Sequence, residues 1–110
     1  MQLHFKKIGQ GKPFIILHGL VGSGDNLQTF AKSISINGYV VYLVDLRNHG
    51  HSPHADEHNY KVMSEDIAEL IERENLQEPI VLGHSMGGKV AMQLAIDYPI
   101  LLSKLIVIDI

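Results

Sequence analysis

Short apolar runs alternate with helix-patterned segments along the whole chain, and this alternation restricts the fold more than any other feature. Five segments predict strands, and most of them are continuous apolar runs, as in strands buried on both faces. They are Leu3 to Ile8, Phe14 to Leu17, Tyr39 to Asp45, Ile80 to Leu82 and Leu105 to Ile110. Such an alternation favours the α/β class, in which a mostly parallel sheet carries helices on both faces.

Three segments between these runs repeat apolar residues with the period of an amphipathic helix. They are the segment from Asp25 to the Asn37-Gly38 pair, the segment from Val62 or Met63 to Glu74, and the segment from Gly88 to Pro99. Glycine after the first helix and proline after the third are typical stop signals.

The composition fits one domain and excludes several functions. The 110 residues are 45% hydrophobic, which is enough for one modest core but not for two domains. Nine basic and twelve acidic residues give a net charge of −3 without a basic block, so a nucleic-acid surface is not indicated. No apolar run is long enough to span a bilayer. The absence of cysteine excludes a disulfide scaffold and a thiol nucleophile, and we expect a soluble cytoplasmic protein.

The pentapeptide Gly83-His84-Ser85-Met86-Gly87 lies between a predicted strand and a predicted helix. A sharp turn in this context lifts the serine hydroxyl clear of its neighbours, and the flanking glycines let the strand and the helix approach. Ser85 is therefore a candidate nucleophile, and the N–H of Met86 at the helix start is a candidate oxyanion donor. The alternative is a glycine-rich turn that contains a serine by chance.

A second motif, Leu17-His18-Gly19-Leu20, ends another predicted strand and leads into a loop with further glycines. The N–H of Leu20 is a candidate for the second oxyanion donor, and the alternative is an ordinary loop between a strand and a helix. Asp109 lies at the carboxyl end of the last predicted strand, where sites form in open α/β sheets. It is a candidate acid of a Ser-His-acid triad, or else a turn former.

The segment from Asp45 to Ser52 follows the central predicted strand and combines charged residues with histidines. We expect Asp45 and Arg47 to pair and hold the loop rather than act on a substrate. His49, His51, His54 and His58 invite a metal interpretation. However, Pro53 stands where the pattern H-x-H-x-D-H needs an aspartate, so we expect no metal ion there. His18 and His84 are expected to be structural.

Together these motifs resemble the α/β-hydrolase superfamily, and the resemblance covers essentially the whole chain as the N-terminal half of that fold. Within it the chain is most similar to the small bacterial esterases and thioesterases of the YbfF type. The resemblance implies a carboxylesterase or thioesterase without a cofactor, in which Ser85 is the nucleophile. It also implies Leu20 and Met86 as oxyanion donors and Asp109 as the matching acid. Ser85 argues against the dehalogenase and epoxide hydrolase branches, which use aspartate at this position.

Residues 1–110 are thus expected to be the part of a single domain that carries the nucleophile. The family's histidine base follows the acid in sequence, so we expect this chain alone to be inactive. Two alternatives stay open, namely a non-hydrolytic perhydrolase or lyase on the same scaffold and a partner-dependent binding fragment. We expect a small-molecule ester or thioester as the substrate. Ile106, Val107 and Ile108 would form an open apolar edge that favours self-association.

Overall fold

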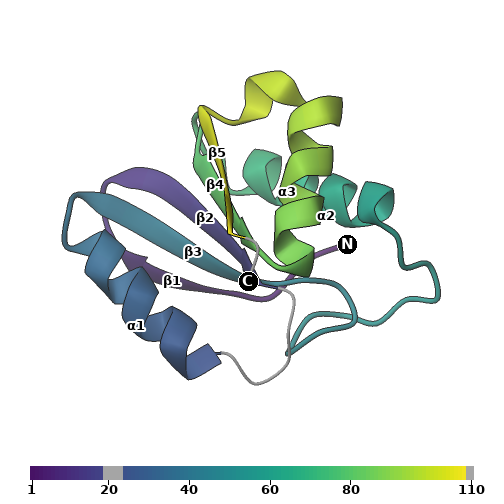
Figure 1. The fold of residues 1–110 in the computed structure, drawn as a ribbon, viewed down its shortest axis with the longest axis horizontal. Coiled ribbons are helices and arrows are strands. Elements are labelled where there is room, and N and C mark those ends of the chain that lie inside the picture. The colour runs from purple at the N-terminus through teal and green to yellow at the C-terminus, as the bar shows by residue number, and fades with distance from the viewer. Residues whose placement is uncertain (19–23, 109–110) are drawn as a thin grey trace.

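A five-stranded sheet forms the centre of the molecule in the computed structural model (Figure 1). The structure describes residues 1–18 and 24–108, with only the backbone described for residues 24–26. The strands are β1 (Phe5–Gly9), β2 (Lys12–His18), β3 (Tyr39–Asp45), β4 (Ile80–His84) and β5 (Lys104–Ile108). Their order across the sheet is β1-β3-β2-β4-β5, and β1 alone among them runs antiparallel to its neighbour.

Helices cover both faces of the sheet (Figure 1). Helix α1 (Gly24–Ser35) lies on one face, while α2 (Tyr60–Arg73) and α3 (Met86–Asp97) pack together on the other, and a short 3₁₀ helix, Pro99–Leu101, precedes β5. No helix in the described ranges has the length and the apolar character needed to cross a membrane. The strand pairing and the placement of the helices confirm the predicted α/β class with a mostly parallel sheet.

The core consists of two layers because successive strand residues point to opposite faces. Ile15 and Leu17 of β2 pack in the larger cluster with α2 and α3, whereas Phe14 and Ile16 pack in the cluster under α1. All four side chains are buried, which is why β2 reads as a continuous apolar run rather than an alternating one.

Several element boundaries differ from the predictions by one or two residues, and two N-terminal ends are informative. The first strand begins at Phe5 rather than Leu3, and it pairs with β3 instead of joining the parallel set. Helix α2 begins at Tyr60 rather than at Val62 or Met63 because Asn59 caps it, with its side-chain oxygen accepting the Val62 N–H at 2.9 Å. The cap lies before the apolar period starts, so periodicity alone places the helix too late.

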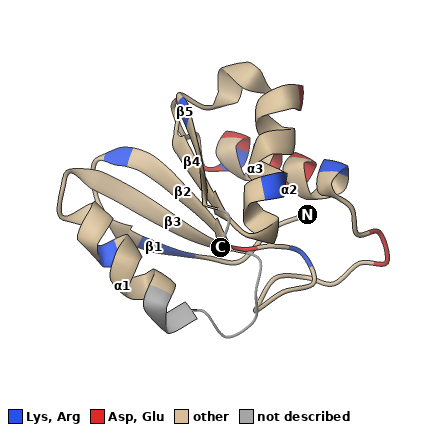
Figure 2. Cartoon of the chain, viewed as in Figure 1, with Lys and Arg blue, Asp and Glu red and all other residues tan. Residues whose placement is uncertain are grey.

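The last strand is at the edge of the sheet and its apolar side chains are exposed. Leu105, Ile106 and Val107 are each about 40% accessible, and the observed strand runs from Lys104 to Ile108. Residues 109 and 110 of the predicted strand lie outside the described residues. Lys and Arg positions are spread over strands and helices rather than gathered on one element (Figure 2).

Candidate active site

Ser85 occupies the turn between β4 and α3 in a backbone conformation that is rare for a residue with a side chain. Its φ is 57° and its ψ is −122°, and α3 begins with the next residue. A non-glycine residue held in such a region costs on the order of 1–3 kcal/mol and persists only where the surrounding structure enforces it. Strain of this kind concentrates at functional sites, so Ser85 is the residue in this turn that calls for a chemical explanation.

The glycines on either side of Ser85 leave no room for a side chain. A Cβ atom on Gly83 would lie 2.2 Å from the backbone oxygen of Gly87, and one on Gly87 would lie 2.2 Å from the backbone oxygen of Leu17. Both distances are far below van der Waals contact. The turn is thus pressed against β2 and against itself, which requires glycine at both positions.

The backbone around Ser85 is fixed, but its hydroxyl makes no capping hydrogen bond. The N–H of Ser85 donates to the carbonyl oxygen of Ile108 at 3.0 Å, which ties the turn to β5. Met86 is the first residue of α3, so its N–H has no partner within the helix. No acidic residue in the first turn offsets the positive end of the helix dipole. This arrangement places an uncapped serine hydroxyl beside an N–H donor suited to an oxyanion.

Three polar residues line up at the carboxyl ends of neighbouring strands. In the parallel register His18 of β2 lies opposite Asp45 of β3 on one side and His84 of β4 on the other. His18 Nε2 and Asp45 Oδ1 are 2.9 Å apart. The Nδ1 atoms of His18 and His84 are buried and have no hydrogen-bond partner within the part of the chain that the structure describes. The His18–Asp45 contact was not predicted from the sequence, although both residues end adjacent strands.

The predicted pair of Asp45 and Arg47 is wrong, because each side chain has another partner. Arg47 donates to both carboxylate oxygens of Asp66 at 2.7 and 2.9 Å and to the carbonyl oxygen of Glu57. Its hydrogen bonds with Asp66 and the attraction of that carboxylate raise the pKa of Arg47 despite burial. Asp66 is itself buried on the inner face of α2, and a carboxylate among apolar positions was the signal that sequence reasoning missed.

Two of the predicted site residues, Leu20 and Asp109, lie outside the described residues. The hydrogen bonds made by histidine side chains in the described ranges go to Asp45, Asn48 and the carbonyl oxygen of Arg47, and none reaches Ser85. Among the described residues, one group of side chains is close enough to hold a metal ion, and it consists of His4, Asp45 and His51.

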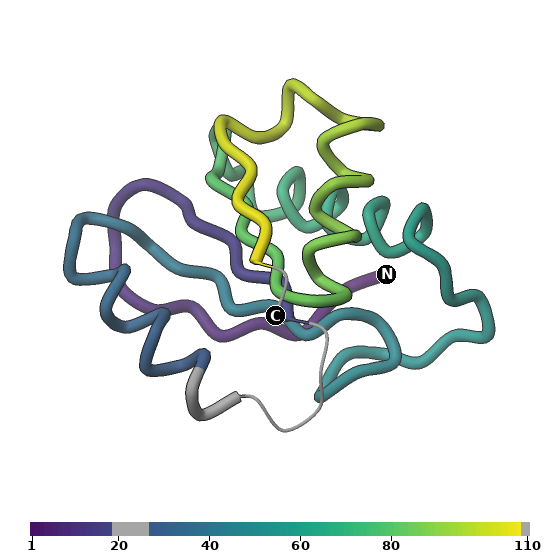
Figure 3. The backbone as a smooth tube through the Cα atoms, in the orientation of Figure 1, coloured from purple at the N-terminus to yellow at the C-terminus, as the bar shows by residue number. Residues whose placement is uncertain are grey.

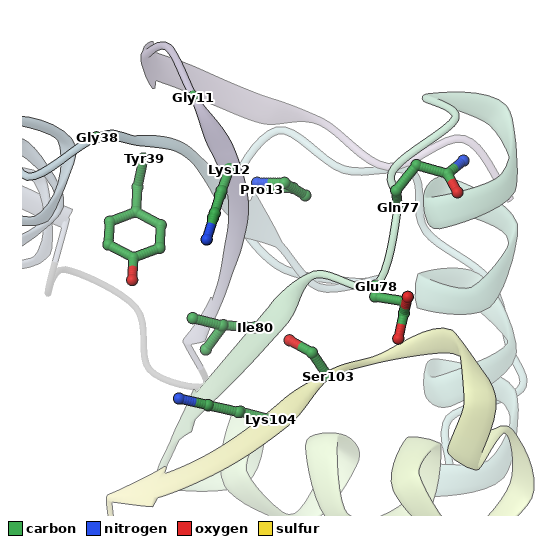
Figure 4. Close-up of a pocket in the computed structure, with 10 residues that line it drawn as sticks. All are labelled: Gly11, Lys12, Pro13, Gly38, Tyr39, Gln77, Glu78, Ile80, Ser103 and Lys104. Carbon is green, nitrogen blue, oxygen red and sulfur yellow. The ribbon is translucent and has the colours of Figure 1, made fainter.

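A pocket of about 750 Å³ lies at the amino ends of the parallel strands (Figure 4). Its walls include Lys12, Tyr39, Ile80 and Lys104, the first residues of four strands. Catalytic groups of open α/β sheets collect at the carboxyl ends of the strands. The pocket therefore lies at the opposite end of the strands from Ser85, the candidate nucleophile.

A family model described as alpha/beta hydrolase fold matches residues 12–110. The chain belongs to this family. It is 50% identical over 101 residues to a "Probable alcohol acetyltransferase" of Saccharomyces cerevisiae, a match that covers 88% of this chain and 30% of the yeast protein. It is also 38% identical over 98 residues to "Esterase YbfF" of Escherichia coli, with 89% of this chain and 38% of the relative covered. The predicted resemblance is therefore confirmed.

A solved structure named "Marine microorganism esterase" shares the fold closely. Its TM-score is 0.90 at 50% identity, and the match covers 96% of this chain and 41% of that one. The chain thus spans between 30 and 41% of the length of these three family members.

Proposed function

We propose that the protein is a serine hydrolase that cleaves carboxylic esters or acyl thioesters through an acyl-enzyme intermediate. The observation that carries this proposal is the strained Ser85, held between two glycines with its hydroxyl uncapped at the start of α3. The esterase names of two relatives support the same chemistry. The substrate is a small acyl ester or thioester, and the lack of cysteine fits the reducing cytoplasm.

In the proposed mechanism, Ser85 Oγ forms a bond to the acyl carbonyl carbon while its proton passes to a histidine base. The N–H groups of Met86 and Leu20 hold the oxyanion of the tetrahedral intermediate, and Asp109 orients the base. The alcohol or thiol then leaves with the proton from the base. Water repeats the attack with the help of the same base, which releases the carboxylic acid and restores the Ser85 hydroxyl.

Residues 1–110 are, in this proposal, the part of a single hydrolase domain that carries the nucleophile. No histidine side chain in the described ranges makes a hydrogen bond to Ser85, so we propose that these residues lack the base and are inactive alone. A fluorophosphonate probe, which labels only an activated serine, tests this directly. We expect strong labelling of Ser85 in the full-length protein and little in residues 1–110, whereas equal labelling would place the base within them.

The hydrolase proposal itself is tested with p-nitrophenyl esters from acetate to octanoate and the full-length protein. We expect turnover of at least one ester and a loss of about 10⁴-fold or more in kcat in Ser85→Ala. Ser33→Ala, at an exposed position of α1, is the matched control because it removes a serine hydroxyl and leaves the turn around Ser85 intact. Full activity in Ser85→Ala, or no turnover of any ester, would exclude the proposal.

A second candidate is acyl transfer to an alcohol, which the yeast relative named an alcohol acetyltransferase favours. The acyl-enzyme is the same, and an alcohol replaces water as the acceptor. Product analysis by gas chromatography with added ethanol separates the two candidates. A new ethyl ester formed in excess of free acid at low ethanol concentration supports transfer, while free acid alone supports hydrolysis.

A further inference from the structure

Three side chains that are distant in sequence meet beside the carboxyl end of β3. His4 directly precedes β1, Asp45 ends β3, and His51 lies in the connection that leads from β3 to α2, which Figure 3 traces as it loops out and returns. One ligand atom of each residue lies within 4.8 Å of the others. The rings of the two histidines are 5.0 Å apart between centroids, and His51 Nδ1 is 3.9 Å from Asp45 Oδ2.

Backbone hydrogen bonds fix the relative positions of these residues. The N–H of Asp45 donates to the carbonyl oxygen of His4 at 3.0 Å, and the N–H of His4 donates to Ser52 Oγ at 2.9 Å. The Ser52 hydroxyl in turn donates to the carbonyl oxygen of Asp45. The main chains that carry the three side chains are therefore connected without the help of a ligand, and their meeting is built into the fold.

The Asp45 carboxylate is held in place by hydrogen bonds that do not involve the imidazole rings of His4 and His51. Its Oδ1 atom is held by His18 Nε2 at 2.9 Å, and its Oδ2 atom accepts the N–H of His51 at 3.1 Å. The loop closes over Oδ2 at Gly50, where φ is 53° and a Cβ atom would lie only 2.5 Å from that oxygen. Carboxylates that bind metal ions are commonly oriented by hydrogen bonds of this kind from neighbouring groups.

We propose that His4, Asp45 and His51 form a three-ligand site for a divalent transition metal ion of the Zn²⁺ type. Two imidazole nitrogens and one carboxylate oxygen suit Zn²⁺, whereas Mg²⁺ and Ca²⁺ prefer oxygen ligands throughout. Water fills the fourth position. Arg47 does not oppose the ion, because its guanidinium is engaged by Asp66.

Closing the site needs a modest side-chain movement. Bonds of about 2.1 Å in a tetrahedral site place ligand atoms roughly 3.4 Å apart, so the present spread must shrink by somewhat more than 1 Å. The His51 side chain is 83% exposed and is free to make this movement. Asp45, which is mostly buried, stays in place as the anchor.

The site is separate from the candidate nucleophile and does not depend on the proposed function. Ser85 follows β4, and β2 lies between β4 and β3 in the sheet, which separates the two strand ends by roughly 10 Å. A bound ion would connect the segment before β1 to the connection after β3. It would thus stabilise the folded chain by an amount that rises with the logarithm of the ion concentration once this exceeds the Kd.

The test uses full-length protein without a polyhistidine tag, titrated with Co²⁺, whose visible absorption reports tetrahedral nitrogen and oxygen ligands. We expect a saturable spectrum at one ion per chain that Zn²⁺ displaces, and a rise in Tm with Zn²⁺. His4→Ala and His51→Ala should each weaken binding by about tenfold or more, since losing even a residue that supports a ligand costs that much.

His54→Ala is the matched control, because His54 is an exposed histidine of the same connection but lies outside the group of three. Its affinity for Co²⁺ should equal that of the unchanged protein. Circular dichroism verifies that each variant is folded, which the exposure of His4 and His51 favours. No saturable spectrum, or equal binding in His4→Ala and the unchanged protein, would overturn the proposal.

Discussion

At the scale of single residues, the turn around Ser85 requires glycine because no Cβ atom fits at Gly83 or Gly87. Gly87 packs so closely on β2 that a Cβ atom would lie 2.2 Å from the Leu17 carbonyl oxygen. Gly87→Ala must therefore push α3 away from the sheet, and we expect it to lower the free energy of unfolding by about 3 kcal/mol or more. Urea denaturation followed by circular dichroism measures this loss.

Gly38→Ala is the matched control for that prediction. Gly38 has a positive φ of 89°, which Gly87 does not, but a Cβ atom there would meet nothing within 4 Å. Its replacement should cost only the conformational penalty of about 1 kcal/mol. Similar losses in the two variants would show that crowding at the turn is not what requires glycine.

The buried pair of Arg47 and Asp66 provides a second prediction. Both side chains are at most 10% exposed, and Arg47 donates to both oxygens of the carboxylate. Asp66→Asn keeps the shape of the side chain but leaves a buried guanidinium without its counter-charge. We expect a loss of about 3 kcal/mol in the free energy of unfolding.

Glu69→Gln is the comparison for Asp66→Asn, because it removes a carboxylate from the same helix at a position that is 49% exposed. The N-terminal ammonium, by hydrogen bonding, lowers the pKa of Glu69. Solvent screens this interaction, so the loss should stay within about 1 kcal/mol. A larger loss in Glu69→Gln than in Asp66→Asn would contradict the importance of the buried pair.

Local motifs and long-range partners differed in how well they could be predicted. The conformation of Ser85 and the need for Gly83 follow from five adjacent residues, and the structure has both. The partner of Arg47 is 19 residues away, and the partner of His18 is 27 residues away. Such pairs depend on strand order and helix placement, which no short pattern contains.

At the scale of elements, both ends of β3 agree with the prediction, because its interior from Val40 to Val44 is buried and continuously apolar and Asp45 ends that run. Helix α2 was predicted too short at its start, since Asn59 acts through a hydrogen bond rather than through periodicity. The antiparallel pairing of β1 was not predicted either. A strand at the sheet edge next to β3 satisfies the same residue pattern in both directions.

The Asn59 cap leads to a prediction for helix α2. Its side-chain oxygen satisfies the N–H of Val62, one of the donors that a helix start leaves unpaired. Asn59→Ala should therefore lower the free energy of unfolding by about 1 kcal/mol, measured by urea denaturation. Asn59→Asp keeps a capping oxygen and should retain stability, so equal losses in both variants would mean that the cap does not stabilise α2.

At the scale of the whole molecule, the sheet is covered in its centre and bare at one side. Helices α2 and α3 fill one face, and α1 covers the part of the other face that is nearest β1 and β3 (Figure 1). In the described part of the chain β5 pairs with β4 alone. The alternation of strands and helices predicted this layered class, but the bare side follows from strand order, which the alternation does not specify.

An open β5 predicts that residues 1–110, prepared alone, associate with one another. Among residues 1–18 and 24–108 no strand pairs with its outer edge, and Leu105, Ile106 and Val107 expose apolar surface on both of its faces. We expect the apparent mass in size-exclusion chromatography with light scattering to rise with concentration. Ile106→Lys places a charge on the edge and should restore the monomer, because charged edge strands resist pairing.

Ile36→Lys, at an 83% exposed position after α1, should leave association unchanged, and an equal effect there would show that the contact is not made through β5.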